Sequence, residues 1–384
     1  MRIVFKYRIF GGIAYTLIIL SLSLYWFRIA GFAVSLSTIF VVYRVFRSKL
    51  KKVEVQFIFL LFIHAIVALL LQIVNVNFFE FIKTYSLLIL ATLFFTGIGY
   101  TASKSRINQK TLRVVYKALI SFVLVFAFAQ VFEFMFYGND RLYFILDNYS
   151  ISTAEDAGRF QAVSMLSYYR PISFYHEPSY FGAVALMLLI GSRALNISRG
   201  WQILSFLGVV LSLSATVYFF CLLFVLIELI VRYNHFIIWI AGTIILLTII
   251  TSNQIVALFR FSEVFNPGTS GHERLIAPLI NLWNDMNGNL SYFAIPLGQF
   301  SIQPNNSLFV LIGYYSFITP LVFMGIKSII KSWGLSRINR LNYYVFFGLI
   351  LFLNGAIISP ESQMILFFLA LTLTKAQREQ SILI

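Results

Sequence analysis

Long apolar runs separated by short polar connections form the dominant pattern of this chain. Twelve runs can be distinguished, most of them close to the roughly 20 residues that cross a membrane as a helix. They cover residues 9–26, 29–45, 55–74, 84–100, 114–136, 179–195, 201–213, 215–231, 236–252, 305–326, 342–358 and 361–374. The pattern predicts an all-α fold, a polytopic bundle of about 12 transmembrane helices that packs as a single domain over residues 1–384.

One apolar stretch, Trp201–Tyr233, needs an argument for its division. Its 33 residues are too many for one straight span and too few for two full ones. A single span would place the 253–304 connection in the cytoplasm and the basic stretch at 327–340 outside, against the positive-inside rule, so we expect a break around Leu213–Ala215. Serine and threonine surround this break, which we expect below the outer surface. Non-helical backbone at membrane depth is tolerated only where it is buried in protein or lines a cavity.

Positive charge is concentrated in every second connection. Of the 29 lysine and arginine residues, 22 fall in the first eight residues, in alternate connections and after the last run. By the positive-inside rule these parts, and with them both termini, are expected in the cytoplasm. Topology therefore explains the net charge of +15, and no nucleic-acid partner is expected.

The two longest connections, about 137–178 and 253–304, are expected on the opposite, periplasmic side. They contain five arginines and no lysine. Loops longer than about 15 residues are usually functional or disordered, and the aromatic content of these two favours ordered, partly helical loops. Only 11% of the chain is charged, compared with about 25% in soluble domains. The single cysteine, Cys221, excludes disulfides within the chain, and we interpret the first run as a span rather than a cleavable signal peptide.

The segment from Arg170 to Gly182 gathers the most chemistry directly before an apolar run. It contains Tyr175, His176, Glu177 and Tyr180, and ionisable groups at a membrane boundary are costly and usually functional. Glu177 precedes a proline that can start a helix. This glutamate is therefore either a cap at the positive end of that helix or a base that deprotonates a sugar hydroxyl. His176 is either that base or an interfacial side chain.

No metal or nucleotide motif accompanies these residues. His176-Glu177 and His272-Glu273 each begin like the zinc motif His-Glu-x-x-His, but the fifth positions hold Tyr180 and Ile276. The chain also has no Asp-x-Asp pair for a metal-bound nucleotide sugar and no Walker-type glycine loop. We therefore expect neither a metal nor another cofactor.

Arginines on the periplasmic side are the strongest candidates for binding a phosphorylated substrate. The candidates are Arg170, Arg260 and Arg274. Arginine clamps phosphate oxygens in bidentate fashion and stays charged in apolar surroundings, and phosphates in the periplasm would arrive on lipids. The alternative is that each arginine forms a loop salt bridge with a glutamate close by in the sequence. Asn305 and Asn306, just before a later run, either cap its helix or bind sugar hydroxyls.

Four of these features together resemble the O-antigen and capsular polysaccharide polymerases of the Wzy type, which are related to O-antigen ligases. They are Arg170 with Tyr-His-Glu-Pro-Ser-Tyr-Phe-Gly at 175–182, the Leu-Ser-Leu-Ser turn at 211–214, Arg260 with Gly-His-Glu-Arg at 271–274, and Pro-Asn-Asn-Ser-Leu-Phe-Val-Leu-Ile-Gly at 304–313. The resemblance covers nearly the whole chain in topology but few residues in identity.

This resemblance implies a metal-independent glycosyltransferase of the bacterial inner membrane. It would polymerise undecaprenyl-diphosphate-linked oligosaccharide repeat units for lipopolysaccharide or capsule, with a chain-length regulator and membrane lipids as candidate partners. Arg274 would hold the donor diphosphate, Glu177 or His176 would be the base, and His272 would contribute to substrate binding. Two departures from ligases favour a polymerase: Asn305-Asn306 replaces His-Asn, and Ala215 stands where ligases place an arginine. The alternatives are an O-antigen ligase and a flippase or exporter of lipid-linked oligosaccharide.

Overall fold

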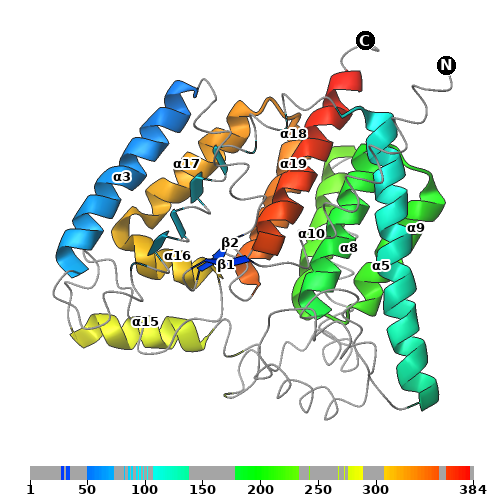
Figure 1. Ribbon diagram of the computed structural model, residues 1–384, viewed down its shortest axis with the longest axis horizontal. Coiled ribbons are helices and arrows are strands. Elements are labelled where there is room, and N and C mark those ends of the chain that lie inside the picture. The colour runs from blue at the N-terminus through cyan, green and yellow to red at the C-terminus, as the bar shows by residue number, and fades with distance from the viewer. Residues whose placement is uncertain are drawn as a thin grey trace.

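The structure, a computed structural model, is a helical bundle whose long helices run roughly side by side (Figure 1). It describes residues 27–29, 32–34, 50–72, 107–137, 178–232, 276–288, 307–353 and 360–380, with isolated positions between 82 and 102 and at 242, 267 and 272. The elements are β1 (Phe27–Ile29), β2 (Phe32–Val34), α3 (Lys52–Gln72), α5 (Gln109–Tyr137), α8 (Pro178–Ala194), α9 (Arg199–Leu211), α10 (Ala215–Arg232), α15 (Ala277–Gly288), α16 (Ser307–Tyr315), η3 (Ser316–Ile318), α17 (Thr319–Ser332), α18 (Arg337–Phe352) and α19 (Pro360–Gln380).

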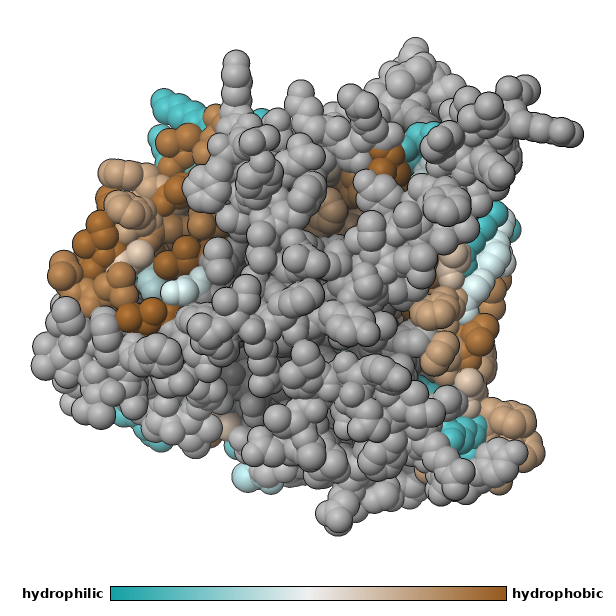
Figure 2. All heavy atoms as spheres, viewed as in Figure 1, coloured by the Kyte–Doolittle hydropathy of each residue, from teal (hydrophilic) through white to brown (hydrophobic). Residues whose placement is uncertain are grey.

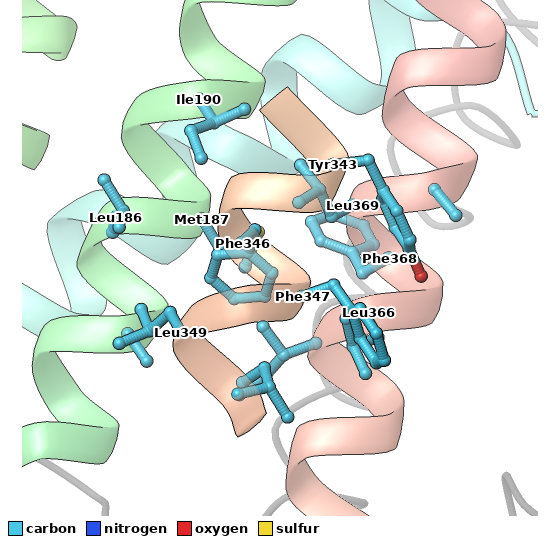
Figure 3. Packing of buried hydrophobic residues seen from close by; sticks show 14 of the residues in the cluster. Leu186, Met187, Ile190, Tyr343, Phe346, Phe347, Leu349, Leu366, Phe368 and Leu369 are labelled. Atoms are coloured by element: carbon cyan, nitrogen blue, oxygen red, sulfur yellow. The ribbon is translucent and has the colours of Figure 1, made fainter. Parts of the chain in front are cut away.

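Helix α8 lies at the centre of the core and contacts α5, α9, α10, α18 and α19. Every residue from Ser179 to Ser192 is buried, as expected for a helix that is apolar all round and enclosed by others. Figure 3 shows Met187 of α8 beside Phe346 of α18, with Phe368 of α19 completing the layer. This dense aliphatic and aromatic packing fixes the position of α8, whose first turn belongs to the candidate site.

A close approach between α5 and α8 depends on a glycine. The Tyr116 hydroxyl donates to Thr372 Oγ1 at 3.0 Å and approaches Met187 Sδ at 3.4 Å. The tyrosine passes directly over Gly191, where an added Cβ would overlap the ring and its hydroxyl. Gly191 therefore allows one tyrosine to join α5, α8 and α19.

Contacts between helix termini show which ends share a side of the bundle. Lys51 Nζ bonds to the Ser332 carbonyl, Gln109 Nε2 to the carbonyls of Lys375 and Ala376 at 3.1 Å, Arg113 Nε to the Leu195 carbonyl at 2.8 Å, and the Ser336 amide to Gln377 Oε1. We call this side, the upper one in Figure 1, the basic end. It gathers the lysines and arginines of the alternate connections that the structure describes, and the other side is called the opposite end below.

Much of the outer surface of the bundle is apolar. Figure 2 shows hydrophobic surface on both flanks, over α3 and α5. Phe62 on α3 is 60% exposed, and Val125 and Phe132 on α5 are 64% and 55% exposed. A surface on which many large apolar side chains are exposed together marks a contact with a membrane or a partner. The arrangement suits contact with lipid acyl chains.

The predicted break in the 201–233 stretch is confirmed as a break between two helices. Helix α9 ends at Leu211 and α10 begins at Ala215. Leu213 between them has a φ of 44°, in the left-handed region that a leucine rarely adopts. The serines on either side of it are buried, Ser212 completely and Ser214 to within 4%. The turn is therefore enclosed by protein, as non-helical backbone between apolar helices requires.

The predicted helix at 305–326 is wrong in one respect, because it is not continuous. Helix α16 ends at Tyr315, a 3-10 turn follows, and α17 leaves at an angle of 117° to α16. Pro320 occupies the first turn of α17. Proline has no amide hydrogen and disfavours helical backbone in the residue before it, so one straight helix cannot pass through this point.

The described residues contain two or three of the predicted membrane spans. Within the described residues, α3 and α5 are long and apolar enough to cross a membrane, and the bent pair α16–α17 would be a third span. Four shorter apolar helices have 10–17 residues. The all-α prediction holds apart from one antiparallel ladder in which Phe27 pairs with Val34. Its second strand lies in the expected 29–45 helix, where a two-residue connection containing glycine favours a hairpin.

Candidate functional site

The first turn of α8 is the described part of the predicted Arg170–Gly182 segment. The helix begins at Pro178, as the sequence indicated, because proline is preorganised for the first helical position. Ser179 and Tyr180 follow and are 5% and 6% exposed. Tyr180, a predicted substrate-binding residue, therefore belongs to the wall of the core at the opposite end.

A second predicted segment, the serine turn Ser212–Ser214, packs against this first turn of α8. A Cβ built on Gly182 would lie 2.5 Å from Ser212 Oγ and 2.9 Å from Val217 Cγ2. The Ser212 hydroxyl itself donates to the Val209 carbonyl at 2.7 Å. Two segments that are 30 residues apart in the sequence thus meet at one point, with glycine allowing the close contact.

The third predicted segment enters the bundle at Ser307, the first residue of α16. Its amide and its hydroxyl both donate to the Leu353 carbonyl, at 3.3 and 3.1 Å. Ser307 is completely buried, and its double hydrogen bond ties the start of α16 to the end of α18. The Pro304-Asn305-Asn306 sequence directly precedes this anchored residue.

The start of α19 adds an unsatisfied polar atom at the opposite end. Ser362 is completely buried, and its hydroxyl has no hydrogen-bond partner among the described residues. Buried polar atoms are normally hydrogen-bonded.

The fourth predicted segment leads into α15. The His272 carbonyl accepts from the Ile276 amide at 2.9 Å, so the helical turn begins before α15 itself. His272 is partly buried. The helix lies across the opposite end rather than along the bundle (Figure 1), and Trp283 on it is 62% exposed. A helix that crosses the bundle in this way and exposes apolar residues is typical of a membrane interface. The presence of α15 also confirms that the 253–304 connection is partly helical.

Of the predicted site residues, the structure describes Tyr180 and His272. The others, Arg170, Tyr175, His176, Glu177, Arg260, Arg274, Asn305 and Asn306, lie outside the described residues. What the structure brings together is the chain beside them. Gly182, two residues after Tyr180 in α8, packs against Ser212 of the serine turn, and Ser307 opens α16 at the same end.

A polar cluster inside the bundle was not among the predicted site residues. His64 Nδ1 lies 2.5 Å from the Tyr85 hydroxyl, and Thr92 Oγ1 lies 2.7 Å from the Tyr315 hydroxyl. The His64 and Tyr315 rings meet edge to face at 5.6 Å, and His64 Nε2 is buried with no hydrogen-bond partner in the described chain. The signal in the sequence was a histidine inside an apolar run, which predicted contacts within the bundle but not the identity of the partners.

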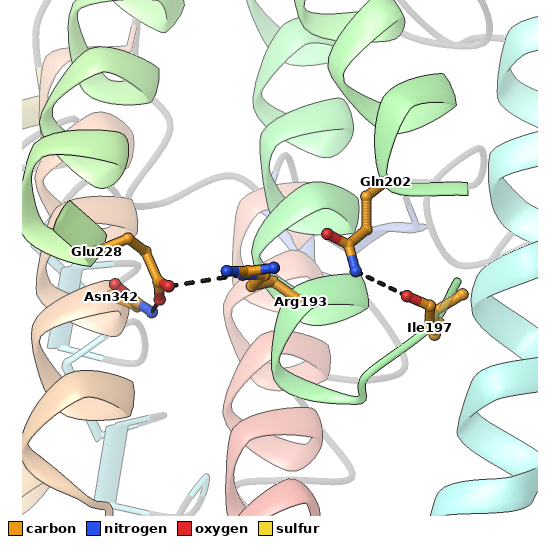
Figure 4. A network of polar contacts seen from close by, with 5 residues as sticks. All are labelled: Arg193, Ile197, Gln202, Glu228 and Asn342. Atoms are coloured by element: carbon orange, nitrogen blue, oxygen red, sulfur yellow. Dashed lines mark hydrogen bonds and ion pairs between the residues drawn. The ribbon is translucent and has the colours of Figure 1, made fainter. Parts of the chain in front are cut away.

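A second interior network lies at the basic end and has a structural explanation. Arg193 Nε is 3.5 Å from Glu228 Oε2, and Asn342 Nδ2 donates to Glu228 Oε1 at 3.1 Å (Figure 4). The glutamate thereby joins α8, α10 and α18, which accounts for a carboxylate in the apolar 215–231 run. Gln202 donates to the Ile197 carbonyl at 2.6 Å in the neighbouring turn.

Comparison of the chain with protein-family models, with curated proteins and with solved structures finds no match.

Proposed function

We propose that this chain polymerises undecaprenyl-diphosphate-linked oligosaccharide repeat units into O-antigen or capsular polysaccharide at the periplasmic face of the bacterial inner membrane. In this proposal the chain crosses the membrane about 12 times, with the basic end in the cytoplasm together with both termini. The enzyme is a membrane glycosyltransferase that uses neither a metal nor another cofactor. A chain-length regulator is a candidate partner.

The observation that carries the proposal is the position of the predicted site segments relative to charge. Tyr180, the serine turn Ser212–Ser214 and Ser307 all lie at the end away from the clustered lysines and arginines. If the basic end faces the cytoplasm, these residues face the periplasm, where lipid-linked repeat units are presented without nucleotides. The packing of Gly182 against Ser212 supports a shared site rather than separate loops.

The chemistry needs one base and one cationic group. A sugar hydroxyl of the incoming repeat unit gives its proton to Glu177 or His176, and its oxygen forms a bond to the anomeric carbon of the growing chain. The bond from that carbon to the diphosphate oxygen breaks, and the lipid diphosphate leaves. Arg274, with Arg170 and Arg260, stabilises the charge that develops on this leaving group. The remaining predicted residues bind the sugars or orient the arginines. They are Tyr175, Tyr180, His272, Asn305 and Asn306.

The direct test uses the purified full-length chain in liposomes supplied with lipid-linked repeat units. Polymer is expected from the wild type and is expected to be lost by Arg274→Ala, while Arg274→Lys retains part of the activity. A matched control is Lys52→Ala, which removes one exposed cation at the basic end and should leave polymer length unchanged. Normal polymer length from Arg274→Ala would remove the catalytic role from this arginine.

A flippase or exporter of lipid-linked oligosaccharide is the second candidate function, because of the polar cluster around His64. Transporters bind substrate near the membrane midplane between discontinuous helices. His64 and Tyr315 lie inside the bundle next to the bend between α16 and α17. An O-antigen ligase is the remaining alternative. It would transfer finished glycan to a lipid core and yield no polymer from repeat units alone.

A further inference from the structure

At the basic end, α5 and α9 lie side by side and form a positively charged surface. Most of its cations take no part in the interior hydrogen bonds and ion pairs. Lys117 on α5 places its ammonium 6.0 Å from the centroid of the Trp201 ring on α9. Lys110 and Arg199, at the starts of the two helices, are both exposed. By contrast, Arg113 donates to the Leu195 carbonyl and Arg193 pairs with Glu228. Three cations therefore remain at the surface.

No carboxylate on either helix neutralises these cations. The sequence contains no aspartate or glutamate from 107 to 132 or from 178 to 227. Both helices begin at the basic end, so the positive ends of their dipoles add to the same field. The side chain of Ser198, at the N-cap of α9, makes no capping hydrogen bond. Within α5 and α9, therefore, no carboxylate compensates the positive potential of this surface.

On both helices, the cations near the basic end share a helical face with exposed apolar side chains further along the helix. On α5, Lys110 and Lys117 share a helical face with Val125, which is 64% exposed. On α9, Arg199 shares a face with Ile203, which is 66% exposed. Residues spaced by three, four and seven positions lie on one face of a helix. Charge at the membrane boundary and hydrocarbon below it form a surface complementary to an amphiphile.

We propose that the α5–α9 surface formed by Lys110, Lys117, Arg199 and Trp201 is a binding site for a glycerophospholipid with an anionic headgroup, in the leaflet at the basic end. The ammonium and guanidinium groups bind the headgroup phosphate, the tryptophan holds Lys117 at the interface, and the acyl chains cover the exposed Val125 and Ile203. Basic surfaces between transmembrane helices on the cytoplasmic side recognise such lipids. The proposal depends on membrane insertion of the bundle but not on the polymerase activity.

The test titrates the purified full-length chain with phosphatidylglycerol and, in parallel, with phosphatidylcholine carrying the same acyl chains, and counts bound lipids by native mass spectrometry. We expect saturable binding of phosphatidylglycerol in preference to phosphatidylcholine. Lys117→Gln combined with Arg199→Gln should weaken that binding roughly 30-fold, at about fivefold per charge removed near a membrane surface. Lys117→Arg keeps the charge and should bind like the wild type.

The matched control combines Lys52→Gln with Lys327→Gln. It removes the same charge from the same end, but on α3 and α17, at the other side of the bundle (Figure 1). An equal loss of lipid in this control would overturn the proposal, since it would reduce the effect to net charge. Equal binding of phosphatidylcholine, or competition by millimolar inorganic phosphate, would overturn it too. If the double variant does not fold, Lys110→Gln takes its place, because it changes only one exposed side chain. The same outcomes then apply, with a smaller expected loss of phosphatidylglycerol binding.

Discussion

Gly182 of α8 lies directly against Ser212 in the turn between α9 and α10, so close that a Cβ at position 182 would be 2.5 Å from the serine hydroxyl oxygen. Neither neighbour can move easily. Ser212 is completely buried and its hydroxyl is bonded to Val209, and α8 is packed on all sides. This contact therefore sets the distance between two of the four predicted site segments.

Gly182→Ala is expected to destabilise the protein by about 1–3 kcal/mol, the usual cost of overpacking a core. Polymer formation should fall with it, because the serine turn is pushed away from α8. Unfolding temperature in detergent and polymer length are the measurements. Gly200→Ala is the control, since an added Cβ there meets nothing within 4 Å. If the Gly182 variant were as stable as this control, the serine turn would have moved aside with no loss of stability, and the prediction would be wrong.

Gly191→Ala should also destabilise the bundle, because the new methyl group overlaps the Tyr116 ring. Shortening the tyrosine is expected to relieve the overlap. The double variant Gly191→Ala with Tyr116→Ala should then lose less stability than the sum of the single variants, with a coupling of about 0.5–3 kcal/mol for residues in contact. Additive losses in thermal unfolding would contradict the proposed overlap.

Glu228→Ala should cost more stability than Arg193→Ala, although the two residues form one ion pair. The glutamate side chain is 12% exposed and also bonds Asn342, whereas the arginine is 38% exposed and can be hydrated. Leaving a buried polar group unsatisfied costs about 1–3 kcal/mol, and Asn342 would be left in that state. Thermal unfolding of both variants at equal salt checks the order, and a larger loss for Arg193→Ala would refute it.

Glu177→Gln and His176→Gln together identify the base. Glutamine retains a weak helix cap at 177 but cannot take a proton, so loss of polymer with normal protein level is expected from Glu177→Gln. Removal of a general base lowers the rate by about 10²–10⁴-fold. Glu155→Gln, which changes a carboxylate of the same 137–178 connection that has no role in the proposed chemistry, is the control. Full activity of Glu177→Gln and loss in His176→Gln would assign the proton to the histidine.

His64→Phe separates the two candidate functions. If the protein is a polymerase, polymer length and the export of single repeat units are unchanged, because no transport step depends on the His64–Tyr85 contact. Tyr85→Phe removes the same hydrogen bond and serves as the comparison. Glycan accumulating on the cytoplasmic side in His64→Phe, with protein level retained, would favour the flippase or exporter.

Local signals in the sequence predicted part of this architecture well. Pro178 marked the start of α8, and the placement of basic residues required a break near Leu213, which the structure has with a left-handed backbone at that residue. Both signals act over a few residues, or through the distribution of charge along the chain. The helical part of the 253–304 connection followed from its aromatic content, and α15 lies there.

Features that depend on distant segments were not predictable in the same way. The run at 305–326 is largely apolar, and Pro320 is the residue within it that disfavours a continuous helix. The sequence alone did not predict the sharp bend between α16 and α17. The cluster of His64, Tyr85 and Tyr315 joins three separate apolar runs, so hydropathy places each residue in a helix without showing that they meet. Similarly, that Gly182 faces Ser212 follows from tertiary packing alone.

The short length of α9 has a consequence for the surrounding lipid. Its 13 residues span about 20 Å, against roughly 30 Å of hydrocarbon in a bilayer. Its outward side chains are exposed, Phe206 by 47%, and would face the acyl chains of a surrounding bilayer. Such hydrophobic mismatch thins the bilayer locally. In the proposed topology the outer leaflet would be drawn inward beside the serine turn, and the diphosphate headgroup of the proposed substrate would then cross a shorter distance to reach the chain next to Tyr180.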